Sequence, residues 1–186
     1  MAESVAEKLQ QPGVVGVIAT DTVYGLAARA SDEKAVQKLY QLKDRDHKPG
    51  TVIAAHLEQL EALGLKHRYL TAVEQFWPGA VSVIIPIADP RLRYLHQGTM
   101  SLAVRIPNDA QLVSVLEQTG PLLTSSANLP GQPPANTLEE AKAYFDDKVD
   151  FYEDGGDLSG RAPSTIIRVI DDAIEVVRQG SVKIDT

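Results

Sequence analysis

Two cations close the first long helical pattern of the chain. Lys43 and Arg45 stand one residue apart in YQLKDRD, residues 40–46. At helical spacing, Lys43 shares a face with Val36 and Tyr40. A lysine at a helix C-terminus can extend its ammonium into water, where the helix dipole favours a cation. An ammonium beside a guanidinium also suits phosphate or carboxylate oxygens. The pattern leaves both interpretations open.

Polar side chains follow two apolar runs of strand length. Thr20, Asp21 and Thr22 follow the first run, and the hydroxyls and amide of LLTSSAN (122–128) follow the second. Open α/β sheets bind ligands at the ends of their strands, and hydroxyls can both donate and accept hydrogen bonds there. Turns whose hydroxyls bond to their own backbone are the alternative.

Arg105 interrupts the apolar run SLAVRIP, residues 101–107. A charge in such a strand needs a partner, which is a carboxylate either of the protein or of a ligand. The glycine-rich segment 155–164 has neither the P-loop spacing nor the spacing of a dinucleotide fingerprint, which favours a turn.

Several classes of site are excluded by residue types. The chain has no cysteine, which rules out disulfides, thiolate metal sites and a cysteine nucleophile. The four histidines lack metal-ligand spacing, so we expect no protein-held metal site. A GxSxG elbow is also absent, which weighs against an α/β-hydrolase.

Strand and helix patterns alternate along most of the chain, which predicts an α/β sheet covered by helices. The expected strands cover 14–20, 51–56, 81–87, 101–107, 121–127, 164–170 and 174–180. The expected helices cover 2–10, a segment capped by Ser31 and ending near Lys43, 57–63, 71–77, 109–118 and 137–147. The last two strands are joined by a short link and must be antiparallel, so the sheet is expected to be mixed.

Bulk properties narrow the class of protein. With 186 residues and no linker, the sequence predicts one domain over 1–186. A net charge of -7 weighs against a nucleic-acid-binding module, although a local basic pocket can still hold an anion. No apolar run is long enough for a membrane helix, and the acidic N-terminus does not resemble a secretory signal. We therefore expect a cytoplasmic protein.

Seven short motifs occur in one order over nearly the whole chain. They are ATDTVYGLAA, KDR, FWPGAVSVII, SLAVRIP, TSSANLPG, PSTII and VVRQG. In this order they resemble the motifs of the YrdC/Sua5/TsaC family, the L-threonylcarbamoyladenylate synthases. The chain is similar to the short, single-domain form of that family.

The resemblance implies a twisted mixed α/β sheet, flanked by helices, with a large concave cavity. It implies the conversion of L-threonine, bicarbonate (or CO2) and ATP, with Mg2+, to threonylcarbamoyl-AMP and pyrophosphate. A separate transferase complex then uses the product for the t6A modification of tRNA. Binding of tRNA by this chain itself is expected to be weak at most, and no membrane is involved.

Site residues are carried over by matching positions in the motifs. The implied threonine site consists of Thr20, Thr51, Arg105, Ser126 and Ser164. The implied ATP site consists of Lys43, Arg45, Ser101, Asn128, Asn136 and Arg178. Within these sets, the resemblance assigns catalysis to Lys43, Arg45, Ser126 and Asn128.

The chain departs from the family pattern near the proposed phosphate site. Ala19 and Asp46 replace usual prolines, Gly50 replaces a leucine, Pro130 replaces a serine, and the loop after Arg45 is one residue shorter. These departures keep a YciO-like paralogue with weak or different nucleotide-dependent activity as an alternative. An RNA-binding or ribosome-maturation module is a second alternative. The carbamoyl-adenylate domains of hydrogenase maturation factors are a third, but those carry zinc-binding cysteines.

Overall fold

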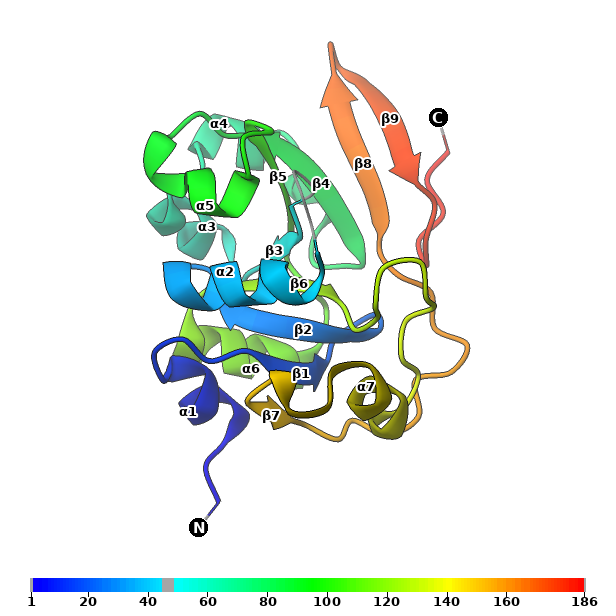
Figure 1. Cartoon of the computed structure of the whole chain (residues 1–186). Helices are drawn as coiled ribbons and strands as arrows, with labels where there is room; N and C mark the ends of the chain where they lie inside the picture. The colour runs from blue at the N-terminus through cyan, green and yellow to red at the C-terminus, as the bar shows by residue number, and fades with distance from the viewer. Residues whose placement is uncertain (1, 45–48, 186) are drawn as a thin grey trace.

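The computed structural model describes residues 2–44 and 49–185, and the strands of this part form one nine-stranded sheet (Figure 1). The spatial order is β7-β1-β2-β6-β3-β5-β4-β8-β9. The strands are β1 (Gly16–Ala19), β2 (Tyr24–Arg29), β3 (Thr51–Ile53), β4 (Val81–Pro86), β5 (Ser101–Arg105), β6 (Leu122–Ser126), β7 (Phe151–Tyr152), β8 (Thr165–Ile170) and β9 (Ala173–Arg178).

The sheet is mixed, as the sequence predicted. The pairs β1–β7, β3–β5 and β4–β8 are parallel, whereas β1–β2, β2–β6, β3–β6, β4–β5 and β8–β9 are antiparallel. The β8–β9 hairpin extends beyond the helices at one end of the molecule (Figure 1).

Short helices flank the sheet, and several begin at a side-chain cap. The α-helices are α1 (Val5–Gln10), α2 (Glu33–Leu42), α3 (Leu57–Leu63), α4 (His67–Thr71), α5 (Arg93–His96), α6 (Ala110–Thr119) and α7 (Leu138–Phe145). Single 3-10 turns are η1 (Glu74–Phe76), η2 (Pro90–Leu92) and η3 (Asp146–Lys148). In α1, α2, α6 and α7 a Ser, Asp or Thr side chain accepts from a backbone N–H of the first turn, which satisfies one of the open donors there.

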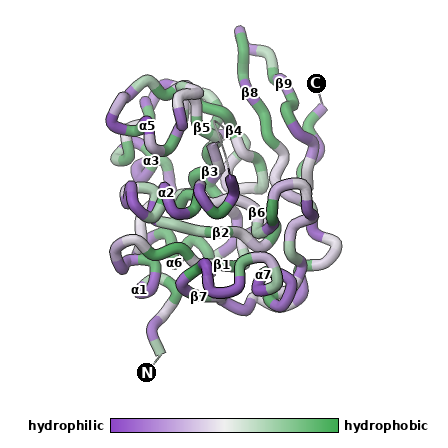
Figure 2. Tube along the Cα trace, in the orientation of Figure 1, coloured by the Kyte–Doolittle hydropathy of each residue, from purple (hydrophilic) through white to green (hydrophobic). Residues whose placement is uncertain are grey.

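Each face of the sheet has its own apolar cluster. The smaller cluster joins strands to α1 and α6 and consists of Leu9, Ile18, Ala27, Ile53, Leu112, Leu116 and Leu122. The larger cluster lies on the other face, where α2 packs on β2 and α5 packs on β5. Figure 2 shows the apolar residues concentrated along the strands. Successive apolar residues of a strand belong alternately to the two clusters, so strands covered on both faces are apolar along most of their length.

The register places polar residues on the same face as the smaller cluster. Thr51 of β3 pairs with Ala103 of β5 and with Thr124 of β6. Because alternate side chains share a face, Thr51 and Thr124 lie on the side of Ile53 and Leu122. Helix α6 packs on the apolar part of this face, and the polar part lines the cavity described below.

Four sequence predictions about the elements were wrong in detail. Strands β2 and β7 were not predicted; the sequence indicated only a turn or a ligand site in the polar residues that precede β2. The helix expected over 71–77 is instead α4 followed by the single turn η1. Helix α2 is capped by Asp32, whose carboxylate accepts from Ala35 N at 3.1 Å, rather than by Ser31.

Within the described ranges, none of the helices combines the length and the apolar character that crossing a bilayer requires.

Candidate functional site

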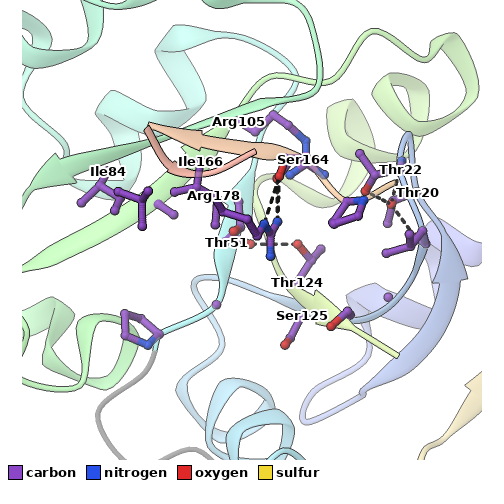
Figure 3. Close-up of a pocket in the computed structure, with 18 of the residues that line it drawn as sticks. Thr20, Thr22, Thr51, Ile84, Arg105, Thr124, Ser125, Ser164, Ile166 and Arg178 are labelled. Carbon is purple, nitrogen blue, oxygen red and sulfur yellow. Dashed lines mark hydrogen bonds between the residues drawn. The ribbon is translucent and has the colours of Figure 1, made fainter. Parts of the chain in front are cut away.

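A cavity of about 550 Å³ opens on the polar part of the sheet. The link between β1 and β2, strands β3, β5 and β6, and the β8–β9 hairpin contribute to its wall (Figure 3). Among the described residues, the lining carries Arg105, Arg168 and Arg178 together with several hydroxyls, and no carboxylate. Arg105 and Arg168 each form an ion pair with a carboxylate outside this lining, Asp21 and Glu175. In a chain of net charge -7, the cavity therefore offers an anion guanidinium and hydroxyl donors rather than three uncompensated charges.

Arg105 is paired with a carboxylate of the protein. Its Nη2 and Nε lie 2.8 and 3.2 Å from the two carboxylate oxygens of Asp21, and the side chains are only 4% and 6% exposed. Of the two partners that the sequence left open, the protein's own carboxylate is therefore the observed one. A third donor, Nη1, binds Ser82 at 2.9 Å. The two remaining N–H groups of the guanidinium are available for a ligand in the cavity.

A row of hydrogen bonds continues from Arg105 to the last strand. Ser82 Oγ lies 2.8 Å from Ser164 Oγ. Arg178 Nη2 donates to Ser164 O at 2.9 Å and to Ser164 Oγ at 3.3 Å (Figure 3). This row connects four strands or strand ends, so the two arginines are held in a fixed relation to each other.

Lys43 is buried and holds the end of β6. Its residue is 3% exposed, and Nζ donates to the carbonyl oxygens of Ser126 at 2.8 Å and Asn128 at 3.0 Å. It also donates to Asn128 Oδ1 at 2.9 Å, and Ser126 Oγ donates to the same oxygen at 2.6 Å. The interpretation of Lys43 as a solvated helix end is therefore wrong. Arg45, its expected partner in anion binding, lies outside the described residues.

The hydroxyls after β1 form a compact turn at the cavity. Thr20 Oγ1 donates to Val23 O at 2.6 Å and accepts from Thr22 N at 3.2 Å. Both threonines are 5% exposed and border the cavity. The hydroxyls of this turn bond to its own backbone and still lie at the cavity wall. The turn therefore does not exclude the ligand-binding interpretation of these residues.

A family model named Sua5_yciO_yrdC and described as "Telomere recombination" matches residues 8–180. The chain belongs to the Sua5/YciO/YrdC family. A relative from Klebsiella pneumoniae, named threonylcarbamoyl-AMP synthase, is 36% identical over 169 residues, covering 87% of this chain and 86% of the relative. One of the same name from Bacillus subtilis is 31% identical over 182 residues, covering 95% of this chain and 53% of the relative.

Solved structures of the family share the fold. Sua5 of P. abyssi complexed with L-threonine superposes with a TM-score of 0.82 at 28% identity, covering 94% of this chain and 52% of that one. E. coli YciO superposes with a TM-score of 0.80 at 25% identity, covering 96% of this chain and 88% of the YciO chain. This chain thus spans about half the length of Sua5 and most of YciO. The family fold predicted from the motifs is confirmed.

Most residues assigned from the family motifs gather at this cavity. Its wall includes Thr20, Thr51, Ser101, Arg105, Ser126, Ser164 and Arg178. Lys43 and Asn128 lie directly behind Ser126, as the hydrogen bonds above show. Asn136 is not part of this wall; its backbone N–H donates to Glu140 Oε2 at 2.7 Å, and its carbonyl accepts from Leu158 N at 2.8 Å. This position makes Asn136 part of the loop before α7.

Ser82 and Arg168 were given no role from the sequence, and Asp21 and Thr22 were singled out only as polar residues after a strand. Asp21, Thr22 and Ser82 belong to the family-like motifs, and their signal was a polar residue inside a conspicuous segment. Arg168 reaches the cavity because β8 alternates between core and surface, which places it on the same side as Ile166.

Proposed function

We propose that this protein is an L-threonylcarbamoyladenylate synthase, which forms threonylcarbamoyl-AMP and pyrophosphate from L-threonine, bicarbonate or CO2, and ATP. The observation that carries the proposal is the cavity whose described lining combines three arginines with hydroxyls and has no carboxylate. The names of relatives at 31% and 36% identity support it. Such a reaction makes the protein a nucleotidyltransferase that works on two anionic substrates.

The two sides of the cavity suit different parts of these substrates. Arg105 and Ser164 present donors that match the carboxylate of threonine. Lys43 stands behind Ser126 and Asn128, where its charge favours a bound triphosphate. Arg45 is proposed to act with it, and Ser101 and Arg178 to contact the nucleotide. Asn136 is proposed as a nucleotide contact through its loop.

Catalysis in this proposal consists of positioning and charge stabilisation. The threonine amine first adds to CO2, or to bicarbonate with loss of water, and gives a carbamate. A carbamate oxygen then bonds to the α-phosphorus of ATP while the bond to pyrophosphate breaks. Fixed cations stabilise the charge that develops on the leaving pyrophosphate. The described cavity lining holds no histidine or carboxylate that could act as a general base. In this proposal the proton of the threonine amine passes to a substrate carboxylate or to solvent.

Magnesium belongs to this proposal as part of the nucleotide substrate. No group of three or more His, Asp or Glu side chains in residues 2–44 and 49–185 is arranged to hold a metal ion. Mg2+ prefers phosphate oxygens and water to a cage made only of protein. It would neutralise part of the triphosphate charge when bound, while the chain's own residues hold the substrates.

One alternative is a YciO-like paralogue, since the fold superposes almost as well on YciO as on Sua5. The shortened loop after Arg45 is the sequence feature that favours it. An RNA-binding module remains the less suitable alternative because of the net charge of -7. In the proposed pathway the adenylate is released to a tRNA threonylcarbamoyl transferase complex, and both proteins act in the cytoplasm.

The proposal is tested by following carbon from labelled bicarbonate. Protein, MgATP, L-threonine and [14C]bicarbonate are mixed, and nucleotides are separated by chromatography. We expect a labelled adenylate that requires both threonine and ATP. A protein that binds threonine and ATP but forms no labelled adenylate would favour the paralogue.

A further inference from the structure

Ser82 is a buried hydroxyl to which the motifs assigned no role. It lies in β4 between Val81 and Val83 and is 0% exposed. Its two hydrogen-bond partners are Arg105 Nη1 at 2.9 Å and Ser164 Oγ at 2.8 Å. A polar residue in a buried strand is costly unless it is fully hydrogen-bonded, so the directions of these bonds can be worked out.

The direction of the Ser82–Ser164 bond follows from the available protons. The guanidinium of Arg105 can only donate, so Ser82 Oγ accepts from it. If Ser164 also donated to Ser82, the Ser82 proton would be buried without an acceptor, which costs the full desolvation penalty of that donor. Ser82 therefore donates its proton to Ser164 Oγ.

This direction leaves Ser164 with one possible role toward a ligand. Ser164 Oγ accepts from Ser82 at 2.8 Å and from Arg178 Nη2 at 3.3 Å, which uses both of its lone pairs. Its own proton has no acceptor within the described residues, and the side chain borders the cavity (Figure 3). Ser164 is thus prepared to donate to a ligand oxygen and is unsuited to accept from a ligand amine.

We propose that Ser82 is a positioning residue that fixes Ser164 as a hydrogen-bond donor to the carboxylate of the amino-acid substrate. The assignment rests on the proposed function for the identity of that substrate. Arg105 and Ser164 both contact the one Ser82 oxygen, so their remaining donors are neighbours at the wall. Two adjacent donors match the two oxygens of a carboxylate. They disfavour binding of a primary amide, because its NH2 group cannot accept a hydrogen bond from the second donor.

The test compares binding of L-threonine with binding of L-threoninamide by calorimetry. We expect wild-type protein to prefer the acid by at least about 100-fold, since a donor-lined site leaves an amide NH2 unpaired. In Ser82→Ala the Ser164 hydroxyl can reorient and accept a hydrogen bond from a ligand. The preference for L-threonine over L-threoninamide should therefore fall roughly tenfold, mainly because threonine binds more weakly. Ser82→Thr keeps the hydroxyl and should restore the preference.

Two further variants separate this role from a general loss of structure. Thr119→Val removes a buried hydroxyl outside the cavity, one that donates to Gly120 O at 2.8 Å, and should leave the ligand preference unchanged. Ser82→Cys retains the side-chain size but is a weak donor and acceptor, so it should narrow the preference even if the alanine variant does not fold.

Each outcome of the comparison decides a different claim. A Ser82→Ala or Ser82→Cys protein with the full wild-type preference would overturn the role of Ser82 and leave the proposed function intact. Wild-type protein that binds neither compound, alone or with MgATP, would overturn the proposed function and this assignment with it.

Discussion

The Lys43 ammonium shows how one side chain can serve both structure and chemistry. It donates to three oxygens of Ser126 and Asn128 at the end of β6, and its residue is almost completely buried. A lysine in this position fixes the polar segment that borders the cavity and brings positive charge to it. The two contributions can be separated by measuring stability and turnover in the same variant.

Lys43→Ala should lower turnover of the proposed reaction by at least about 100-fold, the usual effect of removing one fixed group that stabilises developing charge. It should also lower the free energy of unfolding by about 1–3 kcal/mol, because buried acceptors lose their donor. Steady-state kinetics and urea unfolding provide the two numbers. Lys34→Ala, an exposed lysine of the same helix, is the control and should match wild type. Undiminished turnover in Lys43→Ala would remove Lys43 from the mechanism.

The buried pair of Asp21 and Arg105 gives a second residue-scale prediction. Asp21→Ala should destabilise the fold by about 3–5 kcal/mol, because it leaves a guanidinium buried without its carboxylate. The double variant Asp21→Ala, Arg105→Met should recover part of that loss, since no unpaired charge remains. Chemical unfolding of the single and double variants measures the coupling. Strictly additive losses would show that the two groups do not depend on each other.

At the scale of the element, the cap of α2 connects a helix to the N-terminal segment. Burial alone would raise the pKa of Asp32, but the N–H groups of Gly13 and Ala35 donate to its carboxylate and hold the pKa below its ordinary value. A depressed folded-state pKa means that this stabilisation is fully present above the unfolded pKa of about 3.9. It is lost as the pH falls from there through the folded pKa.

Asp32→Ala should therefore cost about 0.5–2 kcal/mol at neutral pH, and its difference from wild type should shrink below about pH 4. Urea unfolding at a series of pH values measures this difference. Glu33→Ala, an exposed residue of the same turn, should change stability by less than about 0.5 kcal/mol. A gap between Asp32→Ala and wild type that widens in acid would contradict this account of the cap.

The end of β9 is packed closely against the site. A Cβ on Gly180 would overlap the carbonyl oxygen of Pro163 and the backbone of Ser164. Gly180→Ala should therefore displace Ser164 and weaken threonine binding at least about tenfold, as small displacements of a site residue do. Gly120→Ala has open space around its Cβ, but φ is 78° and ψ is -172°, a region that is essentially restricted to glycine. It should therefore cost about 1–3 kcal/mol of stability without affecting binding. Calorimetry on both variants tests the contrast.

The elements predicted correctly are those with strong local patterns. The β-branched runs near 81–87 and 164–170 were identified because strand preference is strong there, and the helix expected at 137–147 begins at an observed Thr137 cap. Strand β2 was missed because Gly25, Ala27 and Ala28 have little intrinsic strand preference. It forms because β1 and β6 pair with both of its edges, which is a long-range effect.

For the candidate site, the sequence identified many of the residues but not the contacts between them. Family-like motifs identified the residues that meet at the cavity, including Thr20, Arg105 and Ser164. They could not reveal that Asp21 neutralises Arg105 or that Ser82 connects Arg105 to Ser164, because those contacts depend on how distant strands pair. Hydrogen-bond direction in particular requires every partner to be known.

At the scale of the whole molecule, an acidic protein presents an arginine-lined cavity on one face of a mixed sheet. A net charge of -7 opposes the approach of long polyanions such as tRNA, whereas the guanidinium and hydroxyl groups of the cavity can donate hydrogen bonds to a small anion. We therefore expect small anionic substrates to bind more tightly than tRNA, as the proposed function requires.

The measurement that tests the central claim most directly is pyrophosphate release from MgATP. Wild-type protein is assayed in a complete mixture, without L-threonine, and without bicarbonate, with folding checked by circular dichroism. We predict pyrophosphate release only in the complete mixture. Release that does not depend on threonine, or none at all from folded protein, would contradict the assignment as a synthase and favour a paralogue with a different nucleotide-dependent activity.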